Sequence, residues 1–392
     1  MKRAILMGAT ALMALTAIPA SGQSPMAPLD HYVVHILANP LGGTSAQGTS
    51  INELDQVAGF AALTGDATMH AMLWEGLHHS VDLGTLGGPN SAIAWPNKNT
   101  QGVFAGISET NTDNPLGEDW SCGLAVFPGA PTKKVCLGFR WDTHSKTMVG
   151  LPPLPGGYNS FGTGINNYGQ VVGWAENGVH EATCNSPQVL QFEAVVWEPD
   201  GKIRTLAPYG DDLDGAATAI NDSGQIVGIS GLCANAIGGA SAKHMLLWHK
   251  NSVTNLGSLG GQFWNTPMDI NHLGDVTGFS DLPGDAEDAP NFNAFLWTRK
   301  HGLQNLLTLP GDSLSEGLGI NNRDQVVGVS FPSGHAFLWQ DGVMTDLNSL
   351  IPKNAKYLLF AAQDINDQGF ITGIAQDKAT GASYAFVAEP KD

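Results

Sequence analysis

Alternating apolar and polar residues divide most of the chain into short strands separated by turns. The stretch "INDSGQIVG" at 220–228 has apolar ends around Asn-Asp-x-Gly, which suits the tight turn of a β-hairpin. The same pattern, with Gly seven positions after Asn, occurs six times, beginning at Asn52, Asn166, Asn221, Asn271, Asn321 and Asn366. A degenerate copy runs from Asn99 to Gly106, and there Lys98 replaces the Ile. The sequence therefore contains seven repeats.

Two further segments recur between these hairpins. One is "HAFLW" or a variant of it, and it ends in Trp in six copies: Trp74, Trp141, Trp197, Trp248, Trp297 and Trp339. The other is "DLGTLGG" or a variant, and it precedes the next Ile-Asn. Each unit of about 50 residues thus has four apolar segments separated by Gly, Asn and Asp, which predicts a four-stranded antiparallel meander.

Seven such units predict an all-β fold, a closed β-propeller of seven four-stranded antiparallel blades. The chain enters at a "DLG"-type strand, "HYVVHILANPLGG", and ends after a "HAFLW"-type strand, "YAFVAEPKD". We therefore expect the N- and C-terminal segments to share one blade, which would remove free sheet edges. We also expect the repeated Trp to pack on the Gly that closes each hairpin.

The first 22 residues have the pattern of a secretory signal peptide. Lys2 and Arg3 precede the apolar run 4–18, and small residues follow it. A retained anchor is the alternative, but the run is shorter than a membrane helix requires. We expect one domain, residues 23–392, that is soluble and either secreted or periplasmic.

Composition and charge agree with a secreted all-β protein and restrict the kinds of partner that it can bind. The chain has 49 Gly, 42% hydrophobic residues and a net charge of −18, which becomes −20 without Lys2 and Arg3. Such a charge repels nucleic acid and anionic lipid. We expect a monomer with an extracellular glycan or protein ligand, no nucleic-acid partner and no membrane insertion.

Length variation is confined to one connection of the repeat, the one from the hairpin Gly to the next Trp. It spans 35 residues from Gly106, 24 from Gly173 and 20 from Gly228. In an antiparallel meander these inserts lie on the same side as the "LGTLGG" loops. Because loop elaborations often carry function, we expect this side to bind the ligand.

The inserts contain all four cysteines, which predicts disulfides Cys122–Cys136, within one insert, and Cys184–Cys233, between equivalent inserts of neighbouring repeats. The binding candidates on the same side are its acidic and Trp residues: Asp113, Glu118, Asp119, Trp120, Asp211, Asp212, Asp214, Trp264, Asp281, Asp285 and Asp312.

The sequence has no recognisable catalytic or metal-binding motif. G-x-S-x-G, H-E-x-x-H and paired C-x-x-C are absent. His70, His244 and His335 share a repeat position and would converge only if their strand lined a central channel; a hydrogen-bonded packing role is favoured. We expect no metal or cofactor, although the acidic loops 209–215 and 281–290 leave Ca²⁺ as an alternative.

The combination "HAFLW…DLGTLGG…IN..GQVVG" resembles the HAF-type repeat of bacterial extracellular proteins and covers nearly all of the mature chain. This resemblance implies export and a repeated β fold, and it implies no activity or catalytic residues. Our functional hypothesis is a secreted, non-enzymatic binding propeller that presents its inserts on one face. The alternative is an extracellular polysaccharide hydrolase or lyase that uses a pair of face carboxylates.

Overall fold

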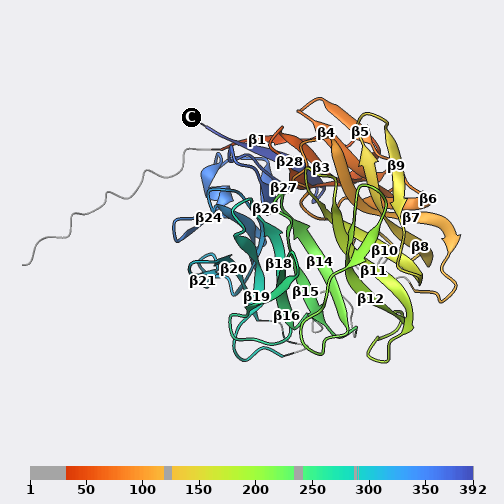
Figure 1. Cartoon of the computed structure of the whole chain (residues 1–392). Helices are drawn as coiled ribbons and strands as arrows, with labels where there is room; N and C mark the ends of the chain where they lie inside the picture. The colour runs from red at the N-terminus through yellow and green to blue at the C-terminus, as the bar shows by residue number, and fades with distance from the viewer. Residues whose placement is uncertain (1–31, 119–125, 234–241, 287–288, 290, 392) are drawn as a thin grey trace, which may run out of the picture.

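The chain folds into sheets of short antiparallel strands arranged in sequence around the molecule. A computed structural model describes residues 32–118, 126–233, 242–286, 289 and 291–391. These residues form 28 strands and one 3₁₀ turn, Leu347–Leu350 (η1), and contain no α-helix. In Figure 1 the colours follow one another around the molecule, so that the first strands lie beside the last. The predicted signal peptide, residues 1–22, lies outside the described residues.

Five sheets have four antiparallel strands each, hydrogen-bonded in chain order. They comprise β6 (Gly87–Ala92), β7 (Val103–Asp113), β8 (Lys134–Asp142) and β9 (Thr147–Leu151); β10 (Gly156–Ile165), β11 (Val171–His180), β12 (Leu190–Trp197) and β13 (Ile203–Thr205); β14 (Asp214–Ile220), β15 (Gln225–Gly231), β16 (His244–His249) and β17 (Ser252–Gly257); β18 (Asn265–Ile270), β19 (Val276–Asp281), β20 (Phe292–Thr298) and β21 (Gly302–Leu307); and β22 (Leu314–Ile320), β23 (Val326–Phe331), β24 (His335–Gln340) and β25 (Val343–Asp346).

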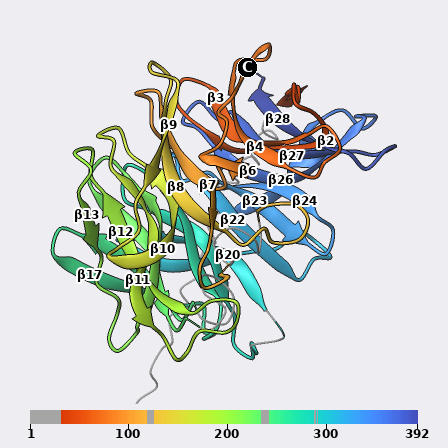
Figure 2. The ribbon, with the colours of Figure 1, turned by 90° about the vertical axis from the view of Figure 1, so that its right-hand side faces the viewer.

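The other eight strands form two antiparallel groups joined by one parallel pair, Ser45 with Ser383. One group is β2 (Gly42–Ile51), β3 (Gln56–Leu63), β4 (Met69–Glu75) and β5 (His79–Asp82); the other is β26 (Tyr357–Ile365), β27 (Ile371–Asp377), β28 (Ser383–Pro390) and β1 (Tyr32–Ile36). β1 pairs antiparallel with β28, from Tyr32 opposite Pro390 to Ile36 opposite Phe386. We number the resulting four-strand units one to seven, from β2–β5 to the β26–β28 group with β1. Figure 2 shows the orange and blue strands side by side from a second direction.

The hairpin glycine is required by a close approach of the first strand of each unit. In six of the units that strand has a register shift opposite the glycine, as between Gly317 and Gly319. A Cβ on Gly328 would lie 1.8 Å from the Glu316 carbonyl oxygen and 2.7 Å from the Phe337 ring. Packing of the repeated Trp on this glycine is therefore a wrong prediction. In units two, five and six a Phe two positions before that Trp occupies the place, and in unit seven Phe386 does so, two positions before Ala388.

The repeated Trp instead ties a unit to the connection that precedes it. Trp74 Nε1 donates to the Ala38 carbonyl oxygen at 2.8 Å, and Trp248 Nε1 donates to Ala207 at 2.7 Å. Trp197 does the same with Pro152 at 2.9 Å. The indole rings are nearly fully buried, so each supplies apolar area as well as a satisfied polar contact.

The repeated asparagines form a closed cycle of hydrogen bonds. Each one donates from Nδ2 to the backbone carbonyl oxygen of the same asparagine in the next unit, and the seventh donates to the first. The members in order are Asn52, Asn99, Asn166, Asn221, Asn271, Asn321 and Asn366. Each Oδ1 also accepts N–H groups of its own turn, as Asn221 does from Ser223 and Gln225. One residue per repeat therefore fixes both the turn and the neighbouring unit.

A buried ion cluster lies beside this cycle and joins units that are not neighbours. Lys98, from unit two, donates to Asp364 of unit seven and lies 3.6 Å from Asp269 of unit five. The carboxylates also accept backbone N–H groups, Asp364 from Ile51 and Asp269 from Ile320. Although burial opposes its charge, the two carboxylates raise the pKa of Lys98 above its ordinary value, and burial raises the pKa of Asp364 to about 7.

Candidate binding face

The two ends of the strands give the molecule two different faces. The first strands of neighbouring units, such as β14 and β18, contact one another, so they lie innermost. We call the side with the hairpin turns of the repeated asparagines the turn face, and the side with the connections between second and third strands the insert face. Each innermost strand runs from the insert face to the turn face because it ends at its asparagine.

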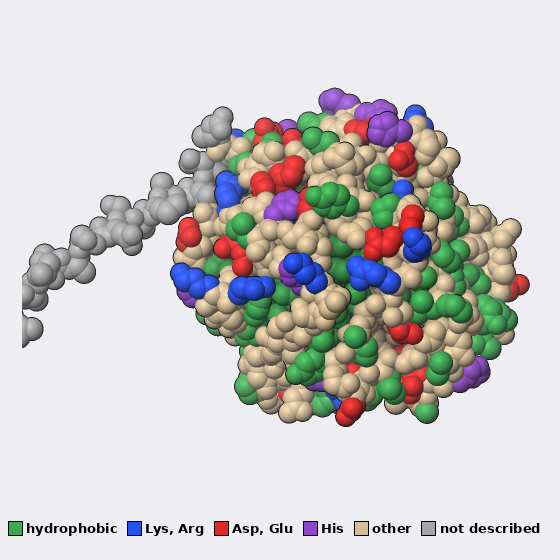
Figure 3. All heavy atoms as spheres, viewed as in Figure 1, with side chains coloured by type: hydrophobic (Ala, Val, Ile, Leu, Met, Phe, Trp, Pro, Cys, Tyr) green, Lys and Arg blue, Asp and Glu red, His purple; other side chains and the backbone are tan. Residues whose placement is uncertain are grey.

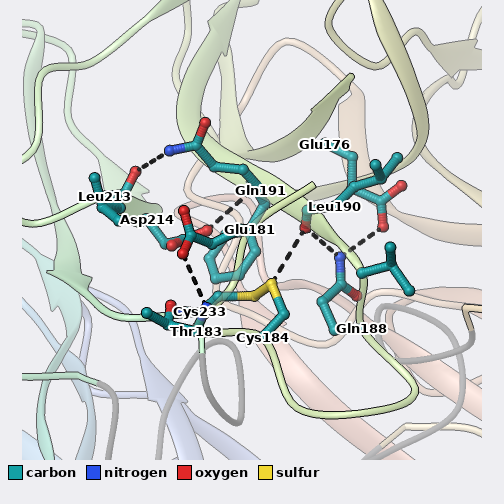
Figure 4. The surroundings of a disulfide bond; sticks show 12 residues. Glu176, Glu181, Thr183, Cys184, Gln188, Leu190, Gln191, Leu213, Asp214 and Cys233 are labelled. Atoms are coloured by element: carbon teal, nitrogen blue, oxygen red, sulfur yellow. Dashed lines mark hydrogen bonds between the residues drawn. A yellow bond between two sulfur atoms is a disulfide. The ribbon is translucent and has the colours of Figure 1, made fainter. Parts of the chain in front are cut away.

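A disulfide joins two inserts of the insert face (Figure 4). Cys184 lies in the β11–β12 connection and Cys233 in the β15–β16 connection, with Cα atoms 4.5 Å apart. The Cys233 N–H donates to Thr183 Oγ1 at 3.1 Å, which adds a second link between the same loops. The predicted pairing Cys184–Cys233 is confirmed. Cys136 is also disulfide-bonded, and its predicted partner Cys122 lies outside the described residues.

Glu118 connects the insert of unit two to that of unit three. Its Oε1 accepts the N–H groups of Val189 at 2.9 Å and Leu190 at 2.7 Å, 71 and 72 positions away. The side chain is fully buried, and burial, together with the nearby Glu176 carboxylate, raises its pKa to about 7. Glu118 therefore joins the inserts of units two and three through buried hydrogen bonds.

Other predicted acidic candidates also accept backbone N–H groups inside the loops. Asp214 Oδ1 accepts from Phe192 at 3.1 Å, and burial raises the pKa of Asp214 to about 7. Asp281 Oδ2 accepts from Trp264 at 2.8 Å, and burial raises its pKa to about 6. Asp312 accepts from Ser333 at 3.0 Å. These carboxylates order the loops of the face.

The remaining candidates differ in what they contact. Asp113 is exposed and pairs with Lys134 at 2.5 Å, and Asp211 is exposed. Trp264 packs edge-on against Phe279 and Phe292. Asp119 and Trp120 lie outside the described residues.

An apolar cluster under the inserts continues across units one to five. It includes Phe60, Phe161, Trp174 and Cys233, with Trp95 and Trp264 packed against it. Phe161 stacks on Trp174 with ring centroids 4.2 Å apart, and Trp95 meets both rings edge-on. The inserts are thus part of the molecular core on this side.

The three histidines at the shared repeat position do not converge, because they begin third strands rather than innermost ones. His70 pairs with Asp82 at 3.0 Å and His335 with Asp346 at 2.8 Å. His244 pairs with Asp212 at 2.6 Å, and Asp212 Oδ2 also accepts from Ser230 Oγ at 2.5 Å. Asp212 therefore orients a histidine on the insert face.

A cleft opens on the insert face beside His244. It has a volume of about 470 Å³, within the usual range of ligand sites, and lies between the outer strands of unit four and the start of unit five. The residues that line it are Lys243, His244, Asn255, Gly257, Ser258, Gly261, Gln262 and Phe263. Sequence reasoning singled out only His244 among these residues, since the others carry no motif.

The turn face has a narrower hollow on the axis of the Asn cycle. It is lined by Lys98, Glu53, His272 and the repeated Ile and Asn residues, and its volume is about 20 Å³. This is room for about one water molecule. Of the two hollows, only the cleft on the insert face is large enough for an organic ligand.

Within the described ranges there is no cluster of three or more His, Cys, Asp or Glu placed to hold a metal ion. Residues 287, 288 and 290 of one acidic loop lie outside those ranges. No helix in the described part of the chain is long and apolar enough to cross a membrane.

No protein-family model and no curated protein matches the chain. Solved structures do resemble it. Acylaminoacyl peptidase of Pyrococcus horikoshii, uncomplexed, has 10% identity and a TM-score of 0.50 over 91% of this chain and 53% of that chain. Acylaminoacyl peptidase in complex with a chloromethyl ketone has 10% identity and a TM-score of 0.52, covering 88% and 51%. The chain thus spans about half the length of these peptidases.

Streptogramin B lyase is similar over most of both chains, with 9% identity, a TM-score of 0.50 and coverage of 91% of this chain and 97% of that chain. These neighbours are β-propeller enzymes. At such low identity the likeness concerns the fold alone, and it agrees with the all-β arrangement of four-stranded antiparallel sheets.

Proposed function

We propose that the chain is a single closed β-propeller of seven blades, the seventh made of β26–β28 and β1, and that it belongs to the HAF-repeat proteins. The closed Asn cycle, the contacts between innermost strands and the β1–β28 pairing support this architecture. Deleting residues 384–389 tests it, because hydrogen exchange at 32–36 should then lose its protection. Unchanged protection there would exclude closure through these strands.

The protein acts outside the cytoplasm in this proposal. The signal-peptide pattern of residues 1–22 supports export, and the Cys184–Cys233 disulfide suits an oxidising compartment. The net charge of −18 supports the absence of nucleic-acid partners. On the face drawn in Figure 3, several Lys and Arg side chains lie in a row across the middle, with acidic side chains above and below them.

Its function is the non-enzymatic binding of an extracellular ligand on the insert face. One observation carries this proposal: the inserts of units two, three and four are joined to one another by Glu118 and by the Cys184–Cys233 disulfide. Loops ordered in advance lose less conformational entropy when they bind. The turn face repeats the same short hairpin and offers little shape to recognise.

The alternative, a hydrolase or lyase, draws support from the raised pKa values of Glu118 and Asp214, because desolvated carboxylates can act as general acids. Both side chains, however, accept backbone N–H groups inside the loops. Binding is therefore the preferred function.

A ligand screen tests the proposal. The purified mature protein is applied to arrays of glycans and of cell-surface proteins, beside a control in which Cys184 and Cys233 are replaced by Ser. We expect a ligand that binds the native protein and binds the control less. A released product on polysaccharides, abolished by Glu118→Gln or Asp214→Asn, would favour the enzyme instead.

A further inference from the structure

His244 differs from its counterparts in the residue that faces it on the fourth strand. His70 and His335 meet Asp82 and Asp346 there, and in unit five Asn293 donates to Asn305 at 3.0 Å. In unit four the facing residue is Asn255. Its Oδ1 accepts the Gly257 N–H at 2.9 Å, and its Nδ2 has no hydrogen bond to another described residue.

The Asn at position 255 changes the hydrogen-bond partner of the histidine. Because Asn255 offers no carboxylate, His244 Nδ1 pairs with Asp212, from the connection that precedes β14. A carboxylate at Nδ1 favours the tautomer with its proton on that nitrogen, which leaves Nε2 as a hydrogen-bond acceptor. Tyr209 packs on the ring with centroids 5.1 Å apart and helps to fix its plane.

The cleft residues Gly261, Gln262 and Phe263 are held by backbone hydrogen bonds. Asp285 Oδ2 accepts the N–H groups of Gln262 at 2.6 Å and Phe263 at 3.1 Å, and the Asp281 carbonyl oxygen accepts from Gly261 at 2.9 Å. Asp281 and Asp285, two of the acidic residues singled out from the sequence, thus hold backbone groups of the cleft lining in place. Their side chains do not line it.

Two polar groups of the cleft are hydrogen-bond donors. Lys243 supplies an ammonium group with no carboxylate within salt-bridge distance among the described residues, and Asn255 supplies a free amide N–H₂. Among the described residues, no Asp or Glu lines the cleft, although acidic residues are twice as frequent as basic ones in the chain. Phe263 adds an apolar surface.

We propose that this cleft binds a sugar that carries a carboxylate, a uronate. Lys243 and Asn255 would hold the carboxylate, His244 Nε2 would accept a ring hydroxyl, and Phe263 would contact the apolar face of the ring. This inference rests on the proposed binding function and specifies the ligand of the same face.

Calorimetry with a trimer of galacturonic acid and with its methyl ester tests the ligand class. The ester has the same ring without the charge, so we expect it to bind at least tenfold more weakly. Lys243→Met should weaken the acid by a similar factor and the ester little. Equal binding of acid and ester, or no binding of either, would overturn the uronate assignment.

The Asn255→Asp variant tests the site by making unit four resemble units one and six. It places a carboxylate opposite His244, as Asp82 and Asp346 lie opposite His70 and His335, and it keeps an acceptor for the Gly257 N–H, so the fold should persist. We expect His244 to turn toward residue 255 and binding to fall at least tenfold. His335→Ala in unit six is the matched control and should bind as the native protein does.

The outcomes separate this inference from the proposed function. If another ligand binds the insert face and the Asn255→Asp and Lys243→Met variants bind it normally, the cleft is not the site although the binding function holds. If neither the screen nor the trimer finds a ligand on the insert face, both proposals fail.

Discussion

The turn face and the insert face are built by opposite strategies. On the turn face the same asparagine makes the same contact in all seven units. On the insert face the contacts differ from unit to unit: the Cys184–Cys233 disulfide, the buried Glu118, and a histidine that pairs with Asp212. The repeated contacts join the units to one another, and the contacts that depart from the repeat order individual loops of the insert face.

Lys98 is the exception that tests this comparison, because it is a departure on the regular face. Its two carboxylate partners occupy positions at which other units have Ser50, Gly164, Ala219 or Gly319. Three changes in three units therefore depend on one another. The cluster should matter more for stability than any single member of the Asn cycle.

Replacing Lys98 by Met should have the largest effect. It leaves Asp269 and Asp364 buried without a cation, which costs about 3–5 kcal/mol of unfolding free energy. Urea denaturation at pH 7.5 measures the loss, and at pH 5 the loss should shrink because protonation neutralises the carboxylates. Lys300→Met, at an exposed position, is the control. Equal stability of the two variants would show that the ion cluster is dispensable.

Removing the disulfide should cost slightly less. Cys184 and Cys233 are 49 positions apart, and closing a loop of that size stabilises a fold by about 2–4 kcal/mol. The Cys184→Ser/Cys233→Ser variant should lose this amount in denaturant, with exchange protection falling first in the 181–190 loop. A loss of protection on the turn face instead would contradict the independence of the two faces.

A single break in the Asn cycle should cost about 1–3 kcal/mol. Asn221→Ala removes the bond to Asn271 and the acceptor for two turn N–H groups. The exposed neighbour Ser223 provides the control, since Ser223→Ala should change stability by less than about 0.5 kcal/mol. Equal effects of Asn166→Ala and Asn321→Ala would sharpen the view that the turn face is uniform.

The smallest effect concerns pH and the insert face. The pKa of Glu118 is raised to about 7 in the folded protein, from an unfolded value near 4.5. The protonated side chain therefore stabilises the fold fully below pH 4.5, and this stabilisation is lost as the pH rises through 7. Unfolding free energy should fall across this window, and Glu118→Gln should flatten the fall. A steeper profile in the variant would mean that Glu118 is stabilised as a carboxylate.

Repeat spacing alone was enough to predict the four-strand units, and the complementary ends were enough to place β1 beside β28. The Cys184–Cys233 pair followed from equivalent inserts. Other features could not be predicted from the sequence because they depend on contacts between residues that are distant in sequence. Lys98 was visible as a departure, yet its partner Asp364 is 266 positions away. The pairing register that places Phe337 rather than Trp339 opposite Gly328 leaves no mark in composition.

The cleft was also beyond sequence reasoning, although a signal for it exists. Comparing strand partners across units would have shown that His70 and His335 face Asp while His244 faces Asn255. That comparison requires the pairing register, which spacing gives only to within a residue or two. Asp281 and Asp285 were noticed for their charge, and their role in supporting the 261–264 wall required the coordinates.

The pairing of β1 with β28 has a consequence for how the protein is made. Synthesis delivers Tyr32–Ile36 first and Ser383–Pro390 last, so β1 has no partner until almost the whole chain has emerged. An unpaired strand is an edge to which other chains can add, and contacts of such long sequence separation form slowly. The newly made chain must therefore keep this first strand apart from other chains until β28 has been synthesised.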